Sequence, residues 1–344
     1  MRAMVVRRYG PPDVFELQQA PDLQPKPGEV LIRAKAIGVN FADLMQRMGI
    51  YPGGPKPPFV PGIEIAGVVE RVGEGMRAGD SDVCRPGDAV VAMPDFGAYA
   101  EWVAVPAQQV YRLPPGMPFE DGAAIAVNYL TAYCAMFTTG RLHPGDRILI
   151  HGAAGGVGTA AVQLARGLGL EIFGTAGPSK QDYLRKIGVQ HPIDYEKSDF
   201  VDVIRKYAPG GVELAMDPIG GKSWARSYAC LAPAGKLAVY GFSAAAGDSG
   251  ARSIRRGLQA MLQSPRFHPF KLMEKGAAVI GVNLGQARAR GSHLRDELGE
   301  IFRLYGEGKI RPVIGKTFPL DRAAAAHQFL QDRKNTGKVI LTTR

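Results

Sequence analysis

Short apolar runs, broken by glycine and proline, fill the first third of the chain. Residues 29–36, 65–72, 88–92 and 98–105 are rich in Val, Ile and Ala and end at turn-forming residues. This pattern is typical of short β-strands. Because the turns are close together and long helical patterns are missing, the segment predicts a compact, barrel-like β-rich domain.

The pattern changes near residue 119. Residues 121–139 are apolar with helical spacing, and strand-like and helix-like runs alternate from residue 147 to about residue 285. Such alternation predicts a doubly wound parallel sheet with helices on its faces. The expected strands are 148–151, 172–175, 192–194, 214–217, 236–240 and 279–283.

The last part of the chain has its own pattern of two helices, at 292–306 and 321–332, and a strand at 338–342. It is too small to form a core alone, so we expect it to return to the first domain. The predicted fold class is α/β. A β-rich domain of residues 1–124 is completed by 286–344, and a parallel-sheet domain covers 125–285.

The turn after the first parallel strand carries a glycine pattern. His151 leads into Gly152-Ala153-Ala154-Gly155-Gly156-Val157-Gly158, and an alanine-rich helix follows. Strand, glycine turn and helix in this order are typical of a dinucleotide-binding βαβ unit. Gly155 lets the backbone approach a pyrophosphate and Gly158 lets the helix pack on the strand, although Ala153 replaces the usual first glycine. We expect Ala154, Gly155, Gly156 and Val157 to meet the phosphates at the helix N-terminus.

The next strand indicates which nucleotide is bound. NAD enzymes usually place Asp or Glu at its end, to bind the ribose 2′-hydroxyl. Here the strand ends in Thr175-Ala176-Gly177, without an acid, and Ser179-Lys180 follow. Ser179 and Lys180 would attract a 2′-phosphate that a carboxylate would repel. The expected cofactor is therefore NADP(H).

Composition narrows the class of protein. The chain has 344 residues and a formal charge of +10, but its basic residues are spread along the sequence without a nucleic-acid motif, so no nucleic-acid partner is expected. Its apolar runs are too short to cross a bilayer and its first residues lack a signal-peptide pattern, so the expected location is cytoplasmic. Cys84, Cys134 and Cys230 are scattered and indicate neither disulfides nor a zinc cluster.

Several motifs together resemble the zinc-independent, zeta-crystallin-like quinone oxidoreductases of the medium-chain dehydrogenase/reductase superfamily. They are Gly38-Val39-Asn40-Phe41-Ala42-Asp43-Leu44, Tyr51, residues 61–69, Pro86-Gly87-Asp88 and the 151–158 turn. Residues 191–195, 216–221, 281–285 and 334–339 look like the branch of the vesicle amine transport protein homologues. The resemblance implies a GroES-like catalytic domain, a Rossmann domain and a homodimer.

The resemblance also bears on metal. Zinc enzymes of this superfamily use Cys and His ligands at positions that here hold Asn40, Ile63 and approximately Asn128. Ile63 cannot bind zinc and the two amides are poor ligands, so no metal is expected. Glu64 is expected to be a structural carboxylate near the cofactor.

By resemblance, Asn40, Asp43 and Tyr51 line the cleft beside the nicotinamide. Tyr51 is the candidate hydrogen-bond donor or proton source, although it could instead cap the proline-rich loop that it begins. Asn40 would orient the cofactor or the substrate oxygen. Asp43 would hold a ribose hydroxyl or cap a helix. Asn128 and Thr131 would face the nicotinamide from the bridging helix, unless they only pack that helix.

The remaining cofactor candidates follow from strand ends and from the resemblance. Lys180 would bind the 2′-phosphate, and Tyr195 would lie at the adenosine end. Phe242, Ser243 and Asn283 come after strands, and Asn335 falls in a loop that related enzymes fold over the cofactor. The candidate cofactor site thus comprises Ala154, Gly155, Gly156, Val157, Gly158, Thr175, Ser179, Lys180, Tyr195, Phe242, Ser243, Asn283 and Asn335. His151 is expected to be a hydrogen-bonded structural residue.

The function expected from these features is an NADPH-dependent reductase of small apolar quinones or α,β-unsaturated carbonyls. Without zinc, such substrates suit the site because they delocalise the charge that hydride transfer creates. Two alternatives stay open. One is an enoyl-thioester reductase, and the other is a nucleotide-binding, membrane-associated adaptor with weak catalysis.

Overall fold

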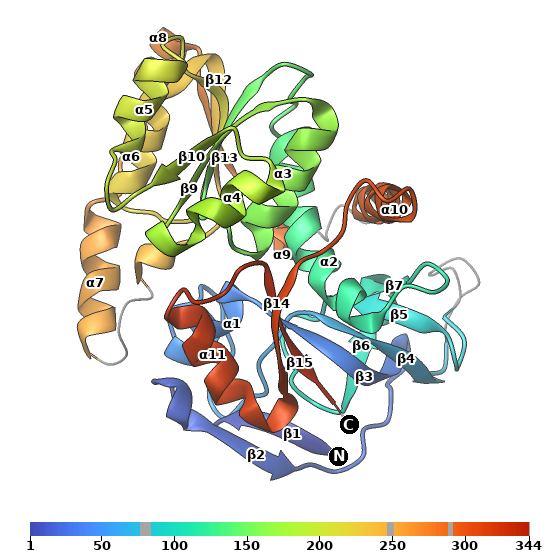
Figure 1. Ribbon diagram of the computed structural model, residues 1–344. Helices are drawn as coiled ribbons and strands as arrows, with labels where there is room; N and C mark the ends of the chain where they lie inside the picture. The colour runs from blue at the N-terminus through green and yellow to red at the C-terminus, as the bar shows by residue number, and fades with distance from the viewer. Residues whose placement is uncertain (76–83, 246–250, 288–291, 344) are drawn as a thin grey trace. The chain divides into compact units, whose positions relative to one another are not determined.

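The computed structural model describes residues 1–75, 84–245, 251–287 and 292–343 (Figure 1). For residues 251–256 and 292 it describes the backbone alone. The chain divides into two compact units. Unit 1 comprises Met1–Val127 and Gly285–Arg344, and unit 2 comprises Asn128–Leu284.

Unit 1 is built on a seven-stranded sheet in which both ends of the chain take part. The sheet runs in the order β14 (Ile314–Pro319), β15 (Lys338–Thr342), β3 (Glu29–Val39), β4 (Ile65–Val72), β5 (Ala89–Ala92) and β7 (Val110–Arg112), and β6 (Trp102–Pro106) also pairs with β3. β15 pairs antiparallel with the end of β3, from Val339 opposite Val39 to Thr342 opposite Ala36. The C-terminal strand therefore completes the N-terminal sheet.

Helices and a small ribbon cover the rest of unit 1. They are β1 (Arg2–Val6) paired with β2 (Phe15–Gln19), α1 (Phe41–Met48), the first part of α2 (Phe119–Tyr133), α10 (Ser292–Gly306) and α11 (Ala323–Gln331). The alternating inward residues of β3, β4 and β15 form its apolar core with Ala323 and Ala326 of α11. Figure 1 shows α11 lying along β15.

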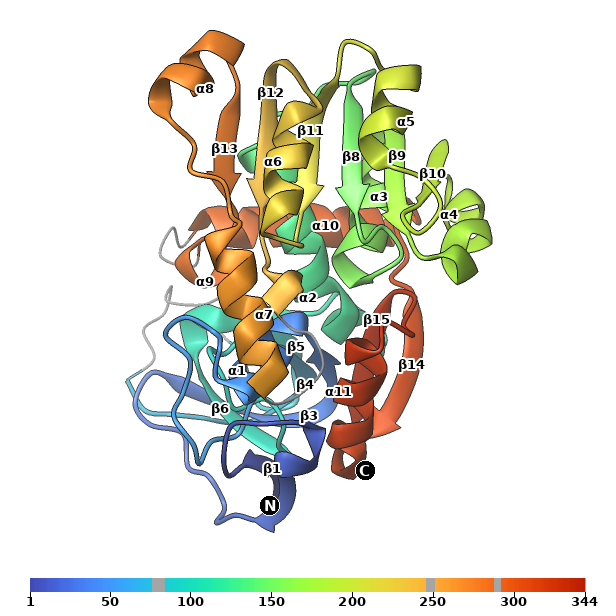
Figure 2. The ribbon, with the colours of Figure 1, turned by 90° about the vertical axis from the view of Figure 1, so that its left-hand side faces the viewer.

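Unit 2 is a six-stranded parallel sheet between helices. Its strands run in the order β10 (His191–Asp194), β9 (Glu171–Ala176), β8 (Arg147–His151), β11 (Val212–Asp217), β12 (Leu231–Val239) and β13 (Ala278–Gly281). This is the Rossmann order, in which the first strand of the domain lies at the centre. Helices α5 (Phe200–Tyr207) and α6 (Lys222–Ala229) lie on one face, and α3 (Gly156–Leu168) and α4 (Gln181–Ile187) lie on the other (Figure 2). The unit is completed by α7 (Ala251–Leu262), α8 (Pro269–Lys275) and the first residue of α9 (Leu284–Ala287).

The expected α/β fold class is confirmed, and all six predicted parallel strands are present. Five of them begin within two residues of the expected position. β12 begins at Leu231 rather than residue 236, because Leu231 pairs with Val212 across an irregular register. The predicted helix at 121–139 ends earlier as an α-helix, since Cys134–Thr138 form a π-helical turn. Helix α1 and strand β14 were not predicted.

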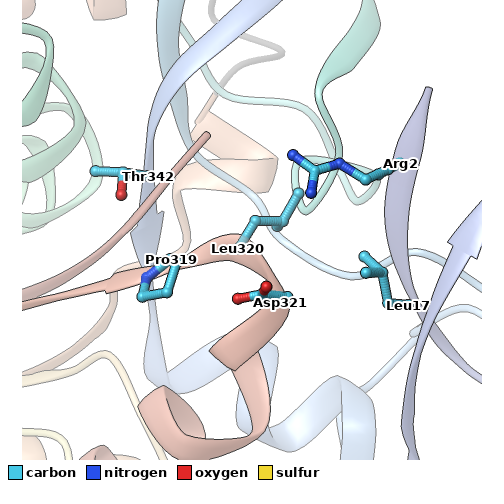
Figure 3. A pocket seen from close by; sticks show the side chains of 6 residues that line it. All are labelled: Arg2, Leu17, Pro319, Leu320, Asp321 and Thr342. Atoms are coloured by element: carbon cyan, nitrogen blue, oxygen red, sulfur yellow. The ribbon is translucent and has the colours of Figure 1, made fainter. Parts of the chain in front are cut away.

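A small hollow lies in unit 1 beside the N-terminal ribbon. Six residues of β1, β2, β14, the turn after it, and β15 line it: Arg2, Leu17, Pro319, Leu320, Asp321 and Thr342 (Figure 3). Its volume of about 10 Å³ is roughly the space that one water molecule needs. The hollow is therefore too small to hold an organic substrate.

Candidate functional site

The glycine turn between β8 and α3 is the best-defined part of the candidate site. Gly152 has a φ of +63°, so it makes the turn that Ala153 was expected to make. A Cβ atom added to Gly158 would lie 2.3 Å from the carbonyl oxygen of Gly152, which leaves no room for any side chain there. The expected close packing of Gly158 is thus confirmed. The first glycine of the turn is Gly152, one position before the usual place, which Ala153 occupies.

The N-terminus of α3 is open to an anion. The helix begins after Gly155, no side chain caps it, and its first turn contains no acidic residue. The first backbone N–H groups of a helix have no partner within the helix, and its dipole favours negative charge there. Ala154 is buried, whereas Gly155, Gly156 and Val157 are partly exposed. The turn therefore presents backbone at the place where the sequence predicts a pyrophosphate.

The end of β9 lies beside this turn and carries no acid. Thr175 is 2% exposed, and its hydroxyl oxygen accepts the N–H of Gly152 at 3.3 Å, so its side chain is used within the fold. Ser179 is exposed and Lys180 is partly exposed, in a short helical turn at Pro178–Lys180. A Cβ atom added to Gly177 would lie 3.2 Å from the hydroxyl oxygen of Tyr195, so the structure brings Tyr195 to this same segment.

Other predicted residues of unit 2 lie at the carboxyl ends of the strands. Phe242 and Ser243 follow β12; the Phe242 ring packs beside Gly220, and the N–H of Ser243 donates to the carbonyl of Pro218 at 2.8 Å. Asn283 follows β13 and is exposed.

Two candidates on α2 are buried in unit 2. Asn128 is 5% exposed, and its side-chain nitrogen would lie 2.4 Å from a Cβ atom added to Gly156, so it packs against the glycine turn. Thr131, one helical turn further along, is 8% exposed.

In unit 1, Asn40 belongs to a buried polar cluster with Glu64 and Lys338. Its side-chain nitrogen donates to the Gly38 carbonyl at 3.1 Å and to Oε2 of Glu64 at 3.0 Å, and its oxygen accepts from Nζ of Lys338 at 2.7 Å. Lys338 also pairs with Glu64, and both side chains are at most 3% exposed. The other oxygen of Glu64 accepts the N–H of Val127 at 2.7 Å.

This cluster fixes the amide of Asn40. Both protons of its nitrogen are used, so Asn40 has no donor left and can only accept a hydrogen bond through its oxygen. Sequence reasoning identified Asn40 and Glu64 but missed Lys338. A lone lysine at the start of a terminal strand looks like an ordinary surface residue, and no pattern in the sequence indicates its burial.

Asp43 lies in a second buried cluster. Its Oδ2 accepts the N–H of Asn40 at 2.8 Å, which caps helix α1, and the hydroxyl of Tyr99 lies at 3.1 Å. Burial raises the pKa of Asp43 to about 7. Of the two roles considered for Asp43, the helix cap is therefore present in the fold.

The cluster continues from Tyr99 to α11. The Tyr99 hydroxyl lies 2.9 Å from Nε2 of His327, Arg47 approaches the other ring nitrogen at 3.5 Å, and Arg47 donates to Gln331 at 2.9 Å. Burial lowers the pKa of His327 well below its usual value and lowers the pKa of Arg47 to about 10. The neutral imidazole and the phenol thus connect the buried Arg47 cation to the Asp43 carboxyl.

The last two candidates lie in loops of unit 1. Tyr51 is partly exposed just after α1, and its carbonyl accepts the N–H of Gly54 at 3.0 Å, which closes the proline-rich loop. Asn335 is 7% exposed, and its side chain donates to the carbonyl of Gly337 at 3.0 Å.

The residues at the zinc-ligand positions do not fit a metal. Asn40 already accepts the Lys338 ammonium, Ile63 has no donor atom, and Asn128 is an amide. Among the described residues, no three His, Cys, Asp or Glu side chains converge as a metal site would require. In the same part of the chain, no helix has both the length and the hydropathy of a membrane span.

Comparison with known proteins identifies the family. A model described as zinc-binding dehydrogenase matches residues 187–341, and one described as alcohol dehydrogenase GroES-like domain matches residues 26–115. The synaptic vesicle membrane protein VAT-1 homolog of Mus musculus is 40% identical over 348 residues, which are 99% of this chain and 83% of that protein. The 2-haloacrylate reductase of Burkholderia is 32% identical over 351 residues, 98% of each chain.

A solved structure supports the same conclusion. Quinone oxidoreductase of Escherichia coli, solved in complex with NADPH, matches with a TM-score of 0.85 and 28% identity over 99% of this chain and 100% of that one. The chain therefore belongs to the medium-chain dehydrogenase/reductase superfamily, as an oxidoreductase of the quinone oxidoreductase-like branch that includes the VAT-1 homologues.

Proposed function

We propose that this oxidoreductase uses NADPH to reduce quinones or α,β-unsaturated carbonyls and that it does so without zinc. The observation that carries the proposal is the carboxyl edge of the sheet in unit 2. There the Gly152–Gly158 turn and the uncapped N-terminus of α3 lie beside an acid-free β9 end. Backbone N–H groups favour a pyrophosphate at this place, and the end of β9 lacks the acidic residue that NAD enzymes use to bind the ribose 2′-hydroxyl.

NADPH supplies the hydride when bound, and residues of the chain bind it. The turn residues Ala154 to Gly158 hold the pyrophosphate. Ser179 and Lys180, with the neighbouring Tyr195, hold the 2′-phosphate. Phe242, Ser243 and Asn283 complete the cofactor site within unit 2. Asn335 is proposed as a further cofactor residue. Thr175 acts within the fold, because its hydroxyl supports the turn.

Substrate chemistry follows from the polar groups of unit 1. Asn40 cannot donate to a substrate oxygen, since Gly38 and Glu64 use both of its N–H groups. Tyr51 therefore donates the hydrogen bond or the proton that the reduced oxygen needs, and Asn40 accepts from a cofactor or substrate N–H or O–H group. Quinones and enones fit this set, because they accept hydride without a metal to polarise them. The names of the E. coli and Burkholderia relatives agree with these two substrate classes.

The proposal is tested by following NADPH oxidation at 340 nm with 1,4-benzoquinone, 9,10-phenanthrenequinone and a simple enone. Turnover with NADPH should exceed turnover with NADH at least about tenfold. Turnover with neither nucleotide would overturn the reductase function. NADPH binding without turnover would favour the membrane-associated adaptor. Turnover of an enoyl thioester alone would favour the enoyl-thioester reductase. The homodimer and the cytoplasmic location stay predictions.

Replacing Lys180 by alanine should weaken NADPH binding by about tenfold, because it removes one charge-assisted contact to the 2′-phosphate. Binding of NADH should change less than about twofold. The matched control is Lys186→Ala, which removes an exposed lysine from the neighbouring helix α4 and should leave both nucleotides unaffected. Equal losses for NADH and NADPH in Lys180→Ala would contradict the assigned role.

A further inference from the structure

A chain of buried hydrogen bonds crosses the carboxyl edge of the sheet in unit 2 beneath the glycine turn. His151, at the end of β8, is 1% exposed and has a partner on each side. Its Nδ1 lies 3.1 Å from the hydroxyl of Thr175 on β9, and its Nε2 lies 2.9 Å from the hydroxyl of Ser227 on α6. Ser227 in turn donates to Oδ2 of Asp217, at the end of β11, at 2.7 Å.

The protons of this chain have one consistent arrangement. Ser227 has a single hydroxyl proton and gives it to Asp217, so the Ser227 oxygen must accept from Nε2–H of His151. Burial lowers the pKa of His151, which keeps the ring neutral with one N–H group. Nδ1 must then accept the hydroxyl proton of Thr175. The Thr175 oxygen is left as the acceptor for the N–H of Gly152 at 3.3 Å.

Through this chain of hydrogen bonds, the His151 imidazole connects two turns at the carboxyl edge of the sheet. One is the positive-φ turn at Gly152, whose next residue also donates its N–H to the Thr175 carbonyl at 3.0 Å. The other is the β11–α6 turn, in which Oδ1 of Asp217 accepts the N–H of Ile219 at 2.7 Å. The Asp217 carboxylate, which is fully buried, anchors the chain at one end, and the Gly152 N–H lies at the other.

We propose that His151, Ser227 and Asp217 are positioning residues that hold the Gly152 turn in the shape that binds the dinucleotide. The inference rests on the proposed function, because it assigns these side chains to the NADPH site of that reductase. None of the three touches the cofactor, since each is at most 1% exposed. They act by fixing the Nε2–H tautomer of His151, in which Nδ1 accepts the Thr175 proton and so orients the Thr175 hydroxyl toward the Gly152 N–H.

Two serines of α6 offer a matched test. Ser223 and Ser227 both donate to Oδ2 of Asp217, at 2.6 and 2.7 Å, but only Ser227 contacts His151. Without Ser227, Nε2–H loses its acceptor, because Oδ2 of Asp217 lies 3.9 Å from Nε2, beyond hydrogen-bond distance. The ring should then change to the Nδ1–H tautomer, in which Nδ1 no longer accepts the Thr175 hydroxyl proton, and the Thr175 hydroxyl should reorient away from the Gly152 N–H. We therefore expect Ser227→Ala to weaken NADPH binding by about three- to tenfold. Ser223→Ala should change it less than about twofold.

Two readouts separate positioning from a general loss of structure. In each variant, kcat at saturating NADPH should stay within about twofold of the unaltered protein while the KM for NADPH follows the binding loss. Nitrogen-15 NMR of histidine-labelled protein should show the Nε2–H tautomer of His151 in the unaltered chain and in Ser223→Ala, and the Nδ1–H tautomer in Ser227→Ala. The NMR assignment in the unaltered chain needs no variant to fold.

The outcomes distinguish the inference from the function on which it rests. An Nδ1–H tautomer in the unaltered protein, or equal losses of NADPH affinity in the two serine variants, overturns the positioning role while the reductase function stands. Failure of the unaltered protein to bind NADPH overturns the proposed function and the positioning role with it.

Discussion

Lys338→Met should destabilise unit 1 by about 3–5 kcal/mol, the usual cost of removing one partner from a buried ion pair. Methionine keeps an unbranched apolar side chain, one atom shorter than that of lysine, and removes the charge. Glu64 would then be fully buried, and its remaining hydrogen-bond donors among the described residues would be the Val127 N–H and the Asn40 amide. These two neutral donors cannot replace the ammonium group, so the Glu64 carboxylate would lose most of the compensation for its burial.

The two tryptophans of the chain allow the loss to be measured in unit 1 alone. Trp102 lies on β6 in unit 1 and Trp224 lies on α6 in unit 2. In a Trp224→Phe background, urea unfolding followed by fluorescence therefore reports unit 1. The same experiment in a Trp102→Phe background, which reports unit 2, is the control and should show little change.

The double variant Lys338→Met with Glu64→Gln decides the cause. Removing both charges should recover most of the stability, because replacing a whole buried pair is often nearly neutral. If the double variant is as unstable as Lys338→Met alone, the loss comes from the packing of the lysine stem and the ion-pair explanation is wrong.

The parts of the fold that depend on local periodicity could be predicted from the sequence. The six strands of unit 2 are short apolar runs between turn residues, and their parallel pairing follows from the alternation with helices. Helix α1 was missed because its buried face includes Gln46 and Arg47, which read as polar positions. Burial of these two side chains depends on elements far away in the sequence, such as α11, which supplies Gln331 to Arg47.

The candidate site shows the same division. Glycine positions can be predicted from the sequence because each glycine meets a local steric requirement. A Cβ atom on Gly158, for example, would collide with the Gly152 carbonyl. The polar clusters cannot be predicted from the sequence, because the residues that form them are far apart in the chain. Lys338 reaches Asn40 over 298 positions and His327 reaches Tyr99 over 228. Sequence alone could indicate Asn40 as a candidate site residue but could not show that its amide has no proton left to donate.

Asp43→Asn should make unit 1 more stable than the unaltered protein at neutral pH, by up to about 3 kcal/mol. The carboxyl of Asp43 is fully buried, and its pKa is raised from 3.8 to about 7, chiefly by burial. Between these values the unfolded chain is ionised and the folded chain holds a proton. The stability contributed by the neutral form is therefore complete below about pH 4, is lost as the pH rises to 7, and falls no further above it.

Asparagine reproduces the protonated form of this side chain. Its oxygen can accept from the Asn40 N–H and from Tyr99, as Oδ2 of Asp43 does, while its NH₂ group takes the place of Oδ1. Oδ1 has no partner among the described residues, so the NH₂ group lacks an acceptor there, which lowers the stability of the variant by about 1–3 kcal/mol at every pH. Charged neighbours act on Asp43 in both directions, since Lys338 lowers its pKa and Glu64 raises it. Both neighbours are present in the variant, so the comparison of the two proteins reports the change at residue 43.

The measurement is urea unfolding of both proteins from pH 4 to pH 8 in the Trp224→Phe background. The stability of Asp43→Asn relative to the unaltered protein should be lowest at pH 4, rise by about 1.4 kcal/mol for each pH unit, and level off above pH 7. In the Trp102→Phe background, which reports unit 2, the difference between the two proteins should stay constant over this range. A difference that is constant across the range in unit 1 would show that Asp43 is ionised throughout. Its carboxylate would then be stabilised by the cap and by Lys338 against the cost of burial.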